Sequence, residues 1–321
     1  MKTKAWLFLI LANLFWAGNM VFGKSVTADF PPVWASFLRW VIAASVLLPM
    51  AQLIEKPSWI QVWRKNWSLL LFMSLTGIVI YTLLTYTALQ HTSSTNGSLI
   101  NSLTPALVST LSFLFLKEKI GLRQGAGLAL SLIGVLIVLT KGQLLAVFGT
   151  RYNAGDAILL AAVFLWAVYS IVSKRAQHLP PITFVAFTAF LGVFLMIPLL
   201  FMQPLHPERV TPFGITGILY LGLFPSIGSF LFWNRGIKEL GAGKASITMN
   251  LMPIFTAGLS VLFGQPLLIS QGIGGAIVIA GMLLSANLMS RKQAASKAED
   301  ERQHRGDIAL KLALQNEKKH S

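Results

Sequence analysis

Hydrophobic residues occur along this chain in long runs that are separated by short polar connections. Each run holds about 18 to 22 residues, and a helix of that length crosses the hydrocarbon layer of a membrane once. The pattern therefore predicts an all-α integral membrane protein. We expect ten transmembrane helices, at about residues 5–23, 32–54, 67–89, 96–116, 121–140, 156–173, 181–202, 213–233, 244–263 and 271–289.

The second half of the chain repeats the first. The segment 86–119 has a second copy about 148 residues later, in which Pro253 takes the place of Pro105. At an offset of 150 residues, Trp166 takes the place of Trp16. Five crossings are an odd number, so the two halves enter the membrane from opposite sides and form inverted five-helix repeats. We predict a first repeat, a connecting loop, a second repeat and a charged cytoplasmic tail, at residues 1–142, 143–155, 156–289 and 290–321.

Composition agrees with a membrane protein. Of the 321 residues, 55% are hydrophobic and only 12% are charged, which is more apolar surface than one soluble core could bury. The lipid bilayer is therefore the expected partner of the chain. Cysteine is absent from the sequence, which excludes disulfides, thiolate catalysis and cysteine metal sites. We expect no metal and no cofactor.

The net charge of +15 is distributed in a way that indicates membrane topology rather than nucleic-acid binding. The Lys and Arg residues lie in the connections between apolar runs and in the tail. With the N-terminus inside, the inner connections hold thirteen basic residues and the outer ones four. We therefore predict a multi-pass protein of the cell membrane with both termini cytoplasmic.

Arg39 is the only basic residue within an apolar run that does not lie near an end of the run. A charge at that depth costs on the order of a few kcal/mol and is usually paired or functional. One interpretation is that Arg39 extends to the outer lipid headgroups. The other is that it binds the carboxylate or phosphate of a small-molecule substrate, assisted by Trp16, Asn19, Asn101 and Asn250.

The first predicted helix carries polar and aromatic residues at its centre. Asn13 and Trp16 share one helix face with Asn19 close beside it, and Trp166 and Tyr169 occupy the equivalent turn of the sixth helix. Trp16 lies about a dozen residues into its helix, too deep for an interfacial anchor. We expect these residues to line a central cavity or to pack in the bundle, with Trp16 and Trp166 facing each other across that cavity.

Two prolines and two glycines indicate special backbone positions. Pro105 and Pro253 each remove one helical hydrogen bond at matching depth, which predicts a hinge or a binding surface; the alternative is that the small polar residues around them only allow close helix packing. Gly127 and Gly274 each end a Gly-x-Gly motif. A dinucleotide site would need a preceding strand and an acidic residue, so we interpret the motif as close packing within the monomer or in a homodimer.

Three strings follow one another in the first half, and each has a diverged copy in the second: LFWAGNMVFGK, PPVWASFLRW and YTALQHTSSTNGSLINSLTPALVSTLSFLFLKEK. In this order the chain resembles the EamA-type branch of the drug/metabolite transporter superfamily over residues 5–289. The resemblance implies a ten-helix bundle that works by alternating access, with exported amino acids and related metabolites as common substrates. It also implies an acidic residue after the fourth and ninth helices. Glu118 matches the first, whereas the second position reads Gly264-Gln265 and lacks the carboxylate.

The sequence favours a secondary transporter that exports a small polar metabolite. A membrane sensor or scaffold without transport remains an alternative, and an intramembrane enzyme is less well supported because no carboxylate pair occurs and the histidines lie in separate connections. Every Asp and Glu lies in a connection, at a helix end or in the tail. We therefore expect facilitated exchange or uniport, or coupling in which the substrate itself carries the charge or proton.

Overall fold

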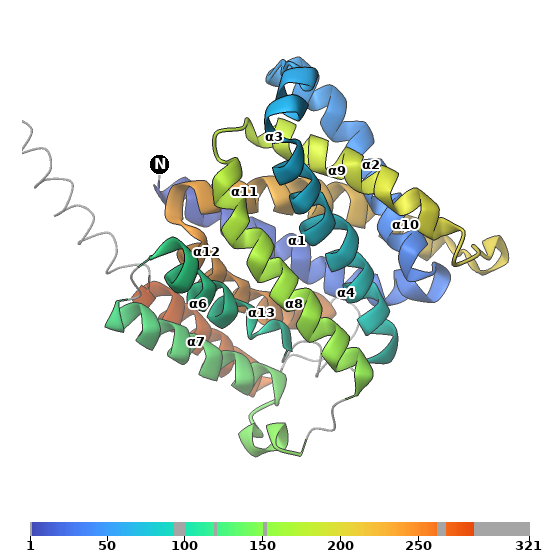
Figure 1. Cartoon of the computed structure of the whole chain (residues 1–321). Helices are drawn as coiled ribbons and strands as arrows, with labels where there is room; N and C mark the ends of the chain where they lie inside the picture. Colours follow the sequence, from blue (N-terminus) through green and yellow to red (C-terminus); the bar gives the residue numbers. More distant parts are fainter. Residues whose placement is uncertain (1, 93–99, 119–120, 150–152, 262–267, 286–321) are drawn as a thin grey trace, which may run out of the picture.

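A computed structural model describes residues 2–92, 100–118, 121–149, 153–261 and 268–285, and within these ranges the chain forms helices and no strand. Figure 1 shows the helices packed into one bundle. The first half contains α1 Lys2–Asp29, α2 Pro32–Ile54, α3 Trp59–Ser74, η1 Leu75–Val79, α4 Ile80–His91, α6 Thr104–Leu116, α7 Leu122–Leu139 and η2 Leu144–Val147. The second half contains α8 Ala154–Val172, η3 Ser173–Ala176, α9 Pro181–Leu200, η4 Pro207–Arg209, α10 Pro212–Leu223, η5 Phe224–Ser229, α11 Phe230–Leu240, α12 Ala242–Ile247, η6 Thr248–Leu251, α13 Met252–Val261 and a last helix, Ile269–Ser285.

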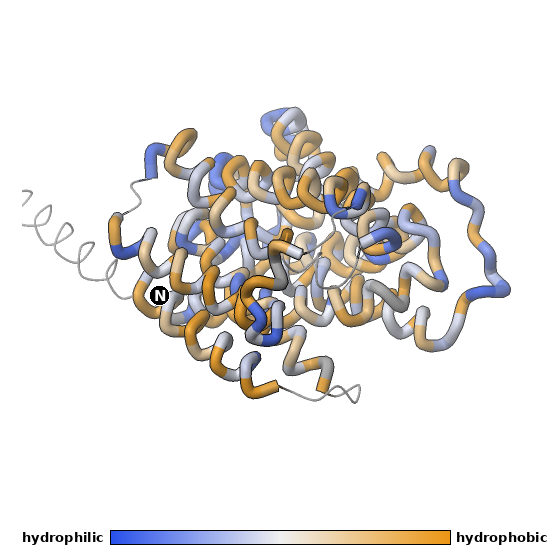
Figure 2. The backbone as a smooth tube through the Cα atoms, turned by 90° about the horizontal axis from the view of Figure 1, so that it is seen from below, coloured by the Kyte–Doolittle hydropathy of each residue, from blue (hydrophilic) through white to orange (hydrophobic). Residues whose placement is uncertain are grey.

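The predicted all-helical membrane fold is confirmed. Seven helices among the described residues are long and apolar enough to cross a membrane, and Thr104–Leu116 and Ile269–Ser285 are shorter apolar helices. Helices suit this environment because they satisfy their backbone hydrogen bonds internally, which lipid cannot do for them. Figure 2 shows that hydrophobic residues follow the helices while hydrophilic ones gather at the connections. The count of ten crossings and the tail at 290–321 remain predictions, and the tail lies outside the described residues.

Helices α2 and α9, which are equivalent in the two repeats, pack antiparallel. Glu55, just after α2, accepts hydrogen bonds from the backbone N–H groups of Ile182 and Thr183 at the start of α9, at 3.1 and 2.7 Å. At the other end, the Gln203 side-chain oxygen after α9 accepts a hydrogen bond of 3.4 Å from the Val33 N–H at the start of α2, and the Gln203 backbone carbonyl accepts one of 2.8 Å from the Trp34 indole. Each helix is therefore capped by the end of its counterpart, as expected for inverted repeats.

The glycine motifs bring a second pair of equivalent helices together. A Cβ atom built on Gly274 would lie 2.7 Å from the Gly134 carbonyl oxygen, and one built on Gly127 would lie 2.6 Å from the Gly281 carbonyl oxygen. Helix α7 and the helix Ile269–Ser285 therefore run antiparallel in backbone contact, a separation that only glycine permits. These glycines pack within one chain.

Both repeats contain a π-helical turn at the same place. η1 interrupts the helix from Trp59 to His91, and η5 interrupts the helix from Pro212 to Leu240, 149 residues later. A π turn adds one residue to the helix and leaves a carbonyl without its usual partner, and such turns occur frequently at functional sites. In η5 the Leu221 carbonyl also lacks its helical partner because residue 225 is proline, and the Ser226 hydroxyl donates to this carbonyl at 2.7 Å.

The helices are also interrupted before the two repeated prolines. α6 begins at Thr104 and α13 at Met252, so that Pro105 and Pro253 each occupy the second helical position, where a missing N–H costs little. The Asn101 carbonyl, which Pro105 cannot serve, instead accepts a hydrogen bond of 2.6 Å from the Thr104 hydroxyl. Both repeats therefore contain a discontinuous helix at matching positions.

Candidate functional site

Arg39 lies in the interior of the bundle, and its side chain is only 3% exposed. Its guanidinium donates three hydrogen bonds, from Nε to the Ser226 hydroxyl at 2.8 Å, from Nη1 to Asn19 Oδ1 at 3.2 Å and from Nη1 to the Tyr86 hydroxyl at 2.5 Å. These partners come from η5, α1 and α4, so Arg39 joins both halves of the molecule. The alternative in which Arg39 extends to the headgroups is wrong, because inward-facing oxygen atoms hold its charged end.

The hydrogen bonds around Arg39 form a network in which Asn19 and Tyr86 also bond to each other. The Tyr86 hydroxyl donates to Asn19 Oδ1 at 3.0 Å, and the rings of Trp40 and Tyr86 lie 5.5 and 5.8 Å from the Arg39 Cζ atom. Oxygen atoms and aromatic faces therefore stabilise the buried cation. Its Nη2 group makes no hydrogen bond to any residue that the structure describes. This nitrogen is available to a ligand.

A small cavity borders this network. It leaves about 10 Å³ for the centre of a water molecule, which is room for roughly one water. A metabolite the size of an amino acid would need the surrounding side chains to move. The lining residues are Trp16, Asn19, Arg39, Tyr81, Thr82, Thr85, Tyr86 and Phe230.

Trp16 and Trp166 contact each other directly. Their ring centroids are 5.1 Å apart with a near-perpendicular geometry, and both rings also pack against Phe230 and Trp233. Trp16 lines the cavity, whereas Trp166 is buried in the aromatic cluster behind it. The indole N–H of Trp166 has no hydrogen-bond partner in the described part of the chain. Trp16 is therefore part of the cavity wall, and Trp166 supports it from the aromatic cluster.

Tyr169 and Asn13 lie near the cavity without lining it. Tyr169 stacks on Trp166 with centroids 5.0 Å apart, and its hydroxyl accepts a hydrogen bond of 3.0 Å from Asn234. Asn13 donates to the Thr248 hydroxyl at 2.9 Å and so connects α1 to η6. Among the predicted residues, the structure therefore places Trp16, Asn19 and Arg39 together at the cavity.

The structure does not bring Asn101 and Asn250 to Arg39. Asn250 is buried and donates a hydrogen bond of 2.8 Å to the Ser131 hydroxyl on α7. Asn101 lines a separate small cavity with Met20 and Pro253. Asn101 lies just before α6, and Asn250 lies in η6, just before α13. The polar groups there form hydrogen bonds where the helices are interrupted and between neighbouring helices.

Tyr86 and Ser226 were not singled out from the sequence. A signal for Tyr86 was present, because Thr82, Thr85 and Tyr86 recur three and four residues apart in an apolar run and so share a helix face. Ser226 gave no such signal. Its hydroxyl reaches Arg39 from a π turn, and the local geometry of a π turn does not follow from hydrophobic periodicity.

Comparison with known proteins decides the family. The sequence profile of the EamA-like transporter family matches residues 3–140 and 153–287, which is most of the chain and both repeats. The chain belongs to the EamA-like transporter family. An EamA-like transporter is a multi-pass membrane protein, in agreement with the apolar helices of this fold.

Similar proteins cover nearly the whole of this EamA-like chain. The uncharacterized transporter YyaM of Bacillus subtilis is 29% identical over 288 residues, covering 88% of this chain and 94% of its own. An uncharacterized transporter of Archaeoglobus fulgidus is 28% identical over 292 residues, covering 89% and 98%. A protein of known crystal structure superposes with a TM-score of 0.74 at 20% identity, covering 90% of this chain and 99% of its own, which shows a shared fold.

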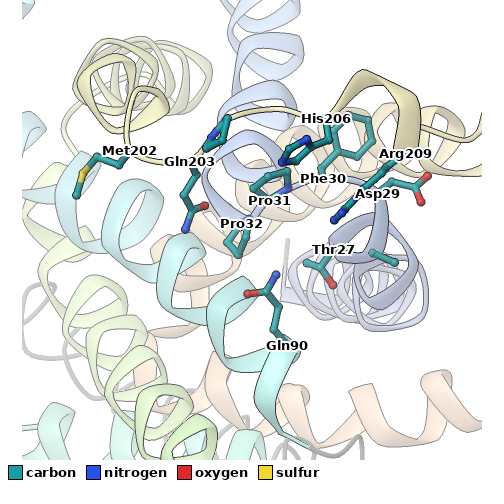
Figure 3. A pocket seen from close by; sticks show the side chains of 12 residues that line it. Thr27, Asp29, Phe30, Pro31, Pro32, Gln90, Met202, Gln203, His206 and Arg209 are labelled. Carbon is teal, nitrogen blue, oxygen red and sulfur yellow. The ribbon is translucent and has the colours of Figure 1, made fainter.

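Two pockets of different size lie at equivalent places in the two repeats of this EamA-like bundle. A pocket of about 310 Å³ lies between the ends of α1, α2 and α4 and the segment after α9, and Figure 3 shows the side chains of Gln90, Gln203 and His206 around it. At the offset of 150 that aligns Trp16 with Trp166, Thr27 of this pocket corresponds to Gln177, and at an offset of 149 Pro32 corresponds to Pro181. Gln177 and Pro181 line the equivalent place at the opposite end, where only about 20 Å³ is left.

The closed end is held by a polar contact between three elements. The Lys174 ammonium, after α8, pairs with the Glu118 carboxylate, after α6. Glu118 also accepts a hydrogen bond of 3.4 Å from the Gly243 N–H at the start of α12. The ion pair is partly exposed, so it contributes about 1 kcal/mol or less to stability. Its importance is positional, because it joins both halves at this end.

Proposed function

We propose that this protein is a secondary transporter that exports a small polar metabolite, such as an amino acid, by alternating access. Arg39 binds the carboxylate or another anionic group of the substrate. The observation that carries this proposal is the buried Arg39 guanidinium, which lies between the two halves, has no carboxylate partner and keeps Nη2 unused. A buried cation without a counter-ion is costly and is a marker of a substrate pathway in membrane proteins.

The unequal ends of the bundle support alternating access. A carrier that exposes one site to two sides in turn must be open at one end and closed at the other. The pocket of about 310 Å³ and its counterpart of about 20 Å³ have this relation. The aromatic cluster around Trp16 and Trp166 and the contact between Glu118 and Lys174 would separate on the closed side when the carrier changes conformation.

The acidic residues support transport without a dedicated proton site. Glu118 is engaged by Lys174 and Gly243, and Asp156 caps α8 by accepting a hydrogen bond of 2.7 Å from the Asn153 N–H. Neither carboxylate faces the cavity beside Arg39. The proposed mechanism is therefore facilitated exchange or uniport, or coupling in which the substrate carries the charge.

A reconstituted transport screen tests the proposed function. Purified protein is placed in liposomes loaded with the twenty proteinogenic amino acids and a set of small carboxylic acids, and release is followed by mass spectrometry. We expect release of at least one compound to exceed that from protein-free liposomes by tenfold or more. Binding without release of any compound would instead favour a sensor or scaffold.

The proposed orientation in the cell membrane, with both termini cytoplasmic, can be tested by cysteine labelling because the sequence has no native cysteine. Ser58 and Gln143 are both exposed and follow helices of opposite direction. A cysteine at Gln143 is expected to react with a membrane-impermeant maleimide on intact cells, and one at Ser58 only after permeabilisation. The reverse pattern would show that the termini are outside.

A further inference from the structure

The oxygen atoms around Arg39 already take part in hydrogen bonds within the protein. Asn19 Oδ1 accepts hydrogen bonds from both Arg39 and Tyr86, at 3.2 and 3.0 Å. The Ser226 oxygen accepts from Arg39 and gives its own proton to the Leu221 carbonyl. Among the described residues, the remaining free groups of the network are donors, Arg39 Nη2 and the amide nitrogen of Asn19. A ligand that enters this site therefore meets an unused cationic donor and no unused amide oxygen.

No ionised acceptor lies at the cavity for a substrate ammonium group. Six of the eleven acidic residues belong to the part of the chain that the structure describes, and the other five lie in the tail. All six lie at helix ends or in connections and have polar partners there. They are Asp29 with Thr211, Glu55 with Thr183, Glu118 with Lys174, Asp156 with Asn153, Glu208 with His206, and Glu239 with Arg235.

The hydroxyl groups of the cavity wall do not replace a carboxylate. Thr82 and Thr85 donate to the carbonyls of Ile78 and Tyr81 in their own helix, which leaves only neutral lone pairs toward the cavity. In a site of low polarity, a neutral oxygen compensates an ammonium group far less than an ionised one does. The Arg39 charge would also repel an ammonium group bound in the same small cavity.

We propose that the substrate of the Arg39 site is a small organic acid with one net negative charge and no ammonium group, such as an α-hydroxy or α-keto acid, and that its export carries net charge. This inference rests on the proposed function and narrows its substrate class, since among the small polar metabolites named there it excludes the amino acids. A bound monoanion neutralises Arg39, whereas a bound zwitterion leaves the site with its net positive charge and adds a second cation beside the first.

The charge of the substrate also supplies a driving force. An anion leaving a cell whose interior is negative moves down the membrane potential, by a factor of about 50 in concentration ratio for each 100 mV and one charge. No proton-binding carboxylate is needed for this process. The confinement of the acidic residues to connections, helix ends and the tail is therefore the expected arrangement for such an exporter.

Pairs of probes that differ only in the ammonium group test the proposal. Alanine is compared with lactate, and phenylalanine with phenyllactate, in liposomes whose potential is set by valinomycin and a potassium gradient. We expect the hydroxy acid of at least one pair to leave at least tenfold faster than the amino acid, and its outward rate to rise when the inside is negative. Equal or faster amino-acid transport, or a rate that ignores the potential, would overturn the inference.

Different results would contradict the anion preference alone and the proposed transporter as a whole. Amino-acid transport that depends on Arg39 would leave the proposed transporter in place and remove only the anion preference. No flux of either member of any pair, together with no quenching of tryptophan fluorescence by millimolar lactate or phenyllactate, would contradict both.

A charge placed at Asn19 provides a second test on the same protein. Asn19→Asp keeps the shape of the side chain but gives Arg39 a counter-ion at hydrogen-bond distance. We expect the ratio of hydroxy-acid to amino-acid transport to fall at least tenfold. Asn19→Leu is the control for a change at this position without added charge. It removes the hydrogen bonds that Oδ1 accepts from Arg39 and Tyr86, so it should lower both rates while keeping the ratio. An unchanged ratio in a monodisperse Asn19→Asp protein would count against the proposal.

Discussion

Replacing Arg39 by glutamine is expected to reduce transport at least a hundredfold in reconstituted liposomes. The substitution removes the only cation of the cavity and leaves the hydroxyls of Ser226 and Tyr86 without their charged donor. A hundredfold loss corresponds to about 2.7 kcal/mol, which is within the range for a charged hydrogen bond in a desolvated site. Arg39→Lys keeps the charge but not the planar fork that reaches three partners, so its activity should be intermediate.

The measurement is the release rate, per correctly folded molecule, of the compound with the largest signal in the transport screen. Arg64→Gln is the matched control, because Arg64 is exposed at an end of the bundle and has no partner in the described residues. This control should transport normally. Normal transport by a monodisperse Arg39→Gln protein would show that Arg39 has a structural role.

The second large effect concerns the glycines that join the two repeats. Gly127→Ala and Gly274→Ala each place a methyl group within 2.7 Å of a backbone oxygen in the facing helix, which neither backbone can avoid without separating. We expect each to destabilise the protein by about 1–3 kcal/mol, and the double variant to lose the folded state on heating well before the wild type. The measurement is thermal unfolding in detergent, followed by circular dichroism.

The same motifs supply the control for this prediction. Gly125 and Gly272 occupy the first position of each Gly-x-Gly motif, and a Cβ atom built on either meets nothing within 4 Å. Alanine at these positions should leave stability unchanged or raise it by up to about 1 kcal/mol, because alanine favours helix more than glycine does. Equal effects of the two pairs of substitutions would contradict the observed packing.

The helices could be predicted from the sequence because they depend on local composition. A run of apolar residues has a low free energy as a helix in lipid whatever its neighbours are, and a lone charge within it either extends to the headgroups or faces the interior, so the sequence left two positions open for Arg39. The partners of Arg39 depend instead on helix rotation. Each π turn adds a residue and so rotates the following turns, which places Tyr86 and Ser226 beside Arg39 in a way that periodicity does not foresee.

The partners of Asn101 and Asn250 could not be predicted from the sequence. Both are amides in the repeated segment, so their chemistry suited the same site as Asn19. In the folded chain the Asn250 amide donates a hydrogen bond to the Ser131 hydroxyl. The Asn101 carbonyl accepts a hydrogen bond from the Thr104 hydroxyl at the start of the interrupted helix. Residue type indicates what a side chain can bind, but the nearest available partner decides what it does bind.

The caps of α2 and α9 have a consequence for the resting state of the carrier. At one end the cap is the carboxylate of Glu55, which accepts from two backbone N–H groups and the Thr183 hydroxyl, whereas at the other it is the neutral Gln203. Charge-assisted bonds are the stronger ones. A carrier whose two ends had identical hydrogen bonds would be open to either side for equal fractions of the time. Under the proposed mechanism and orientation, these unequal hydrogen bonds make the empty carrier favour the state that is open at the Gln203 end. The bonds of Glu55 must therefore break before the carrier can bind substrate from the cytoplasm.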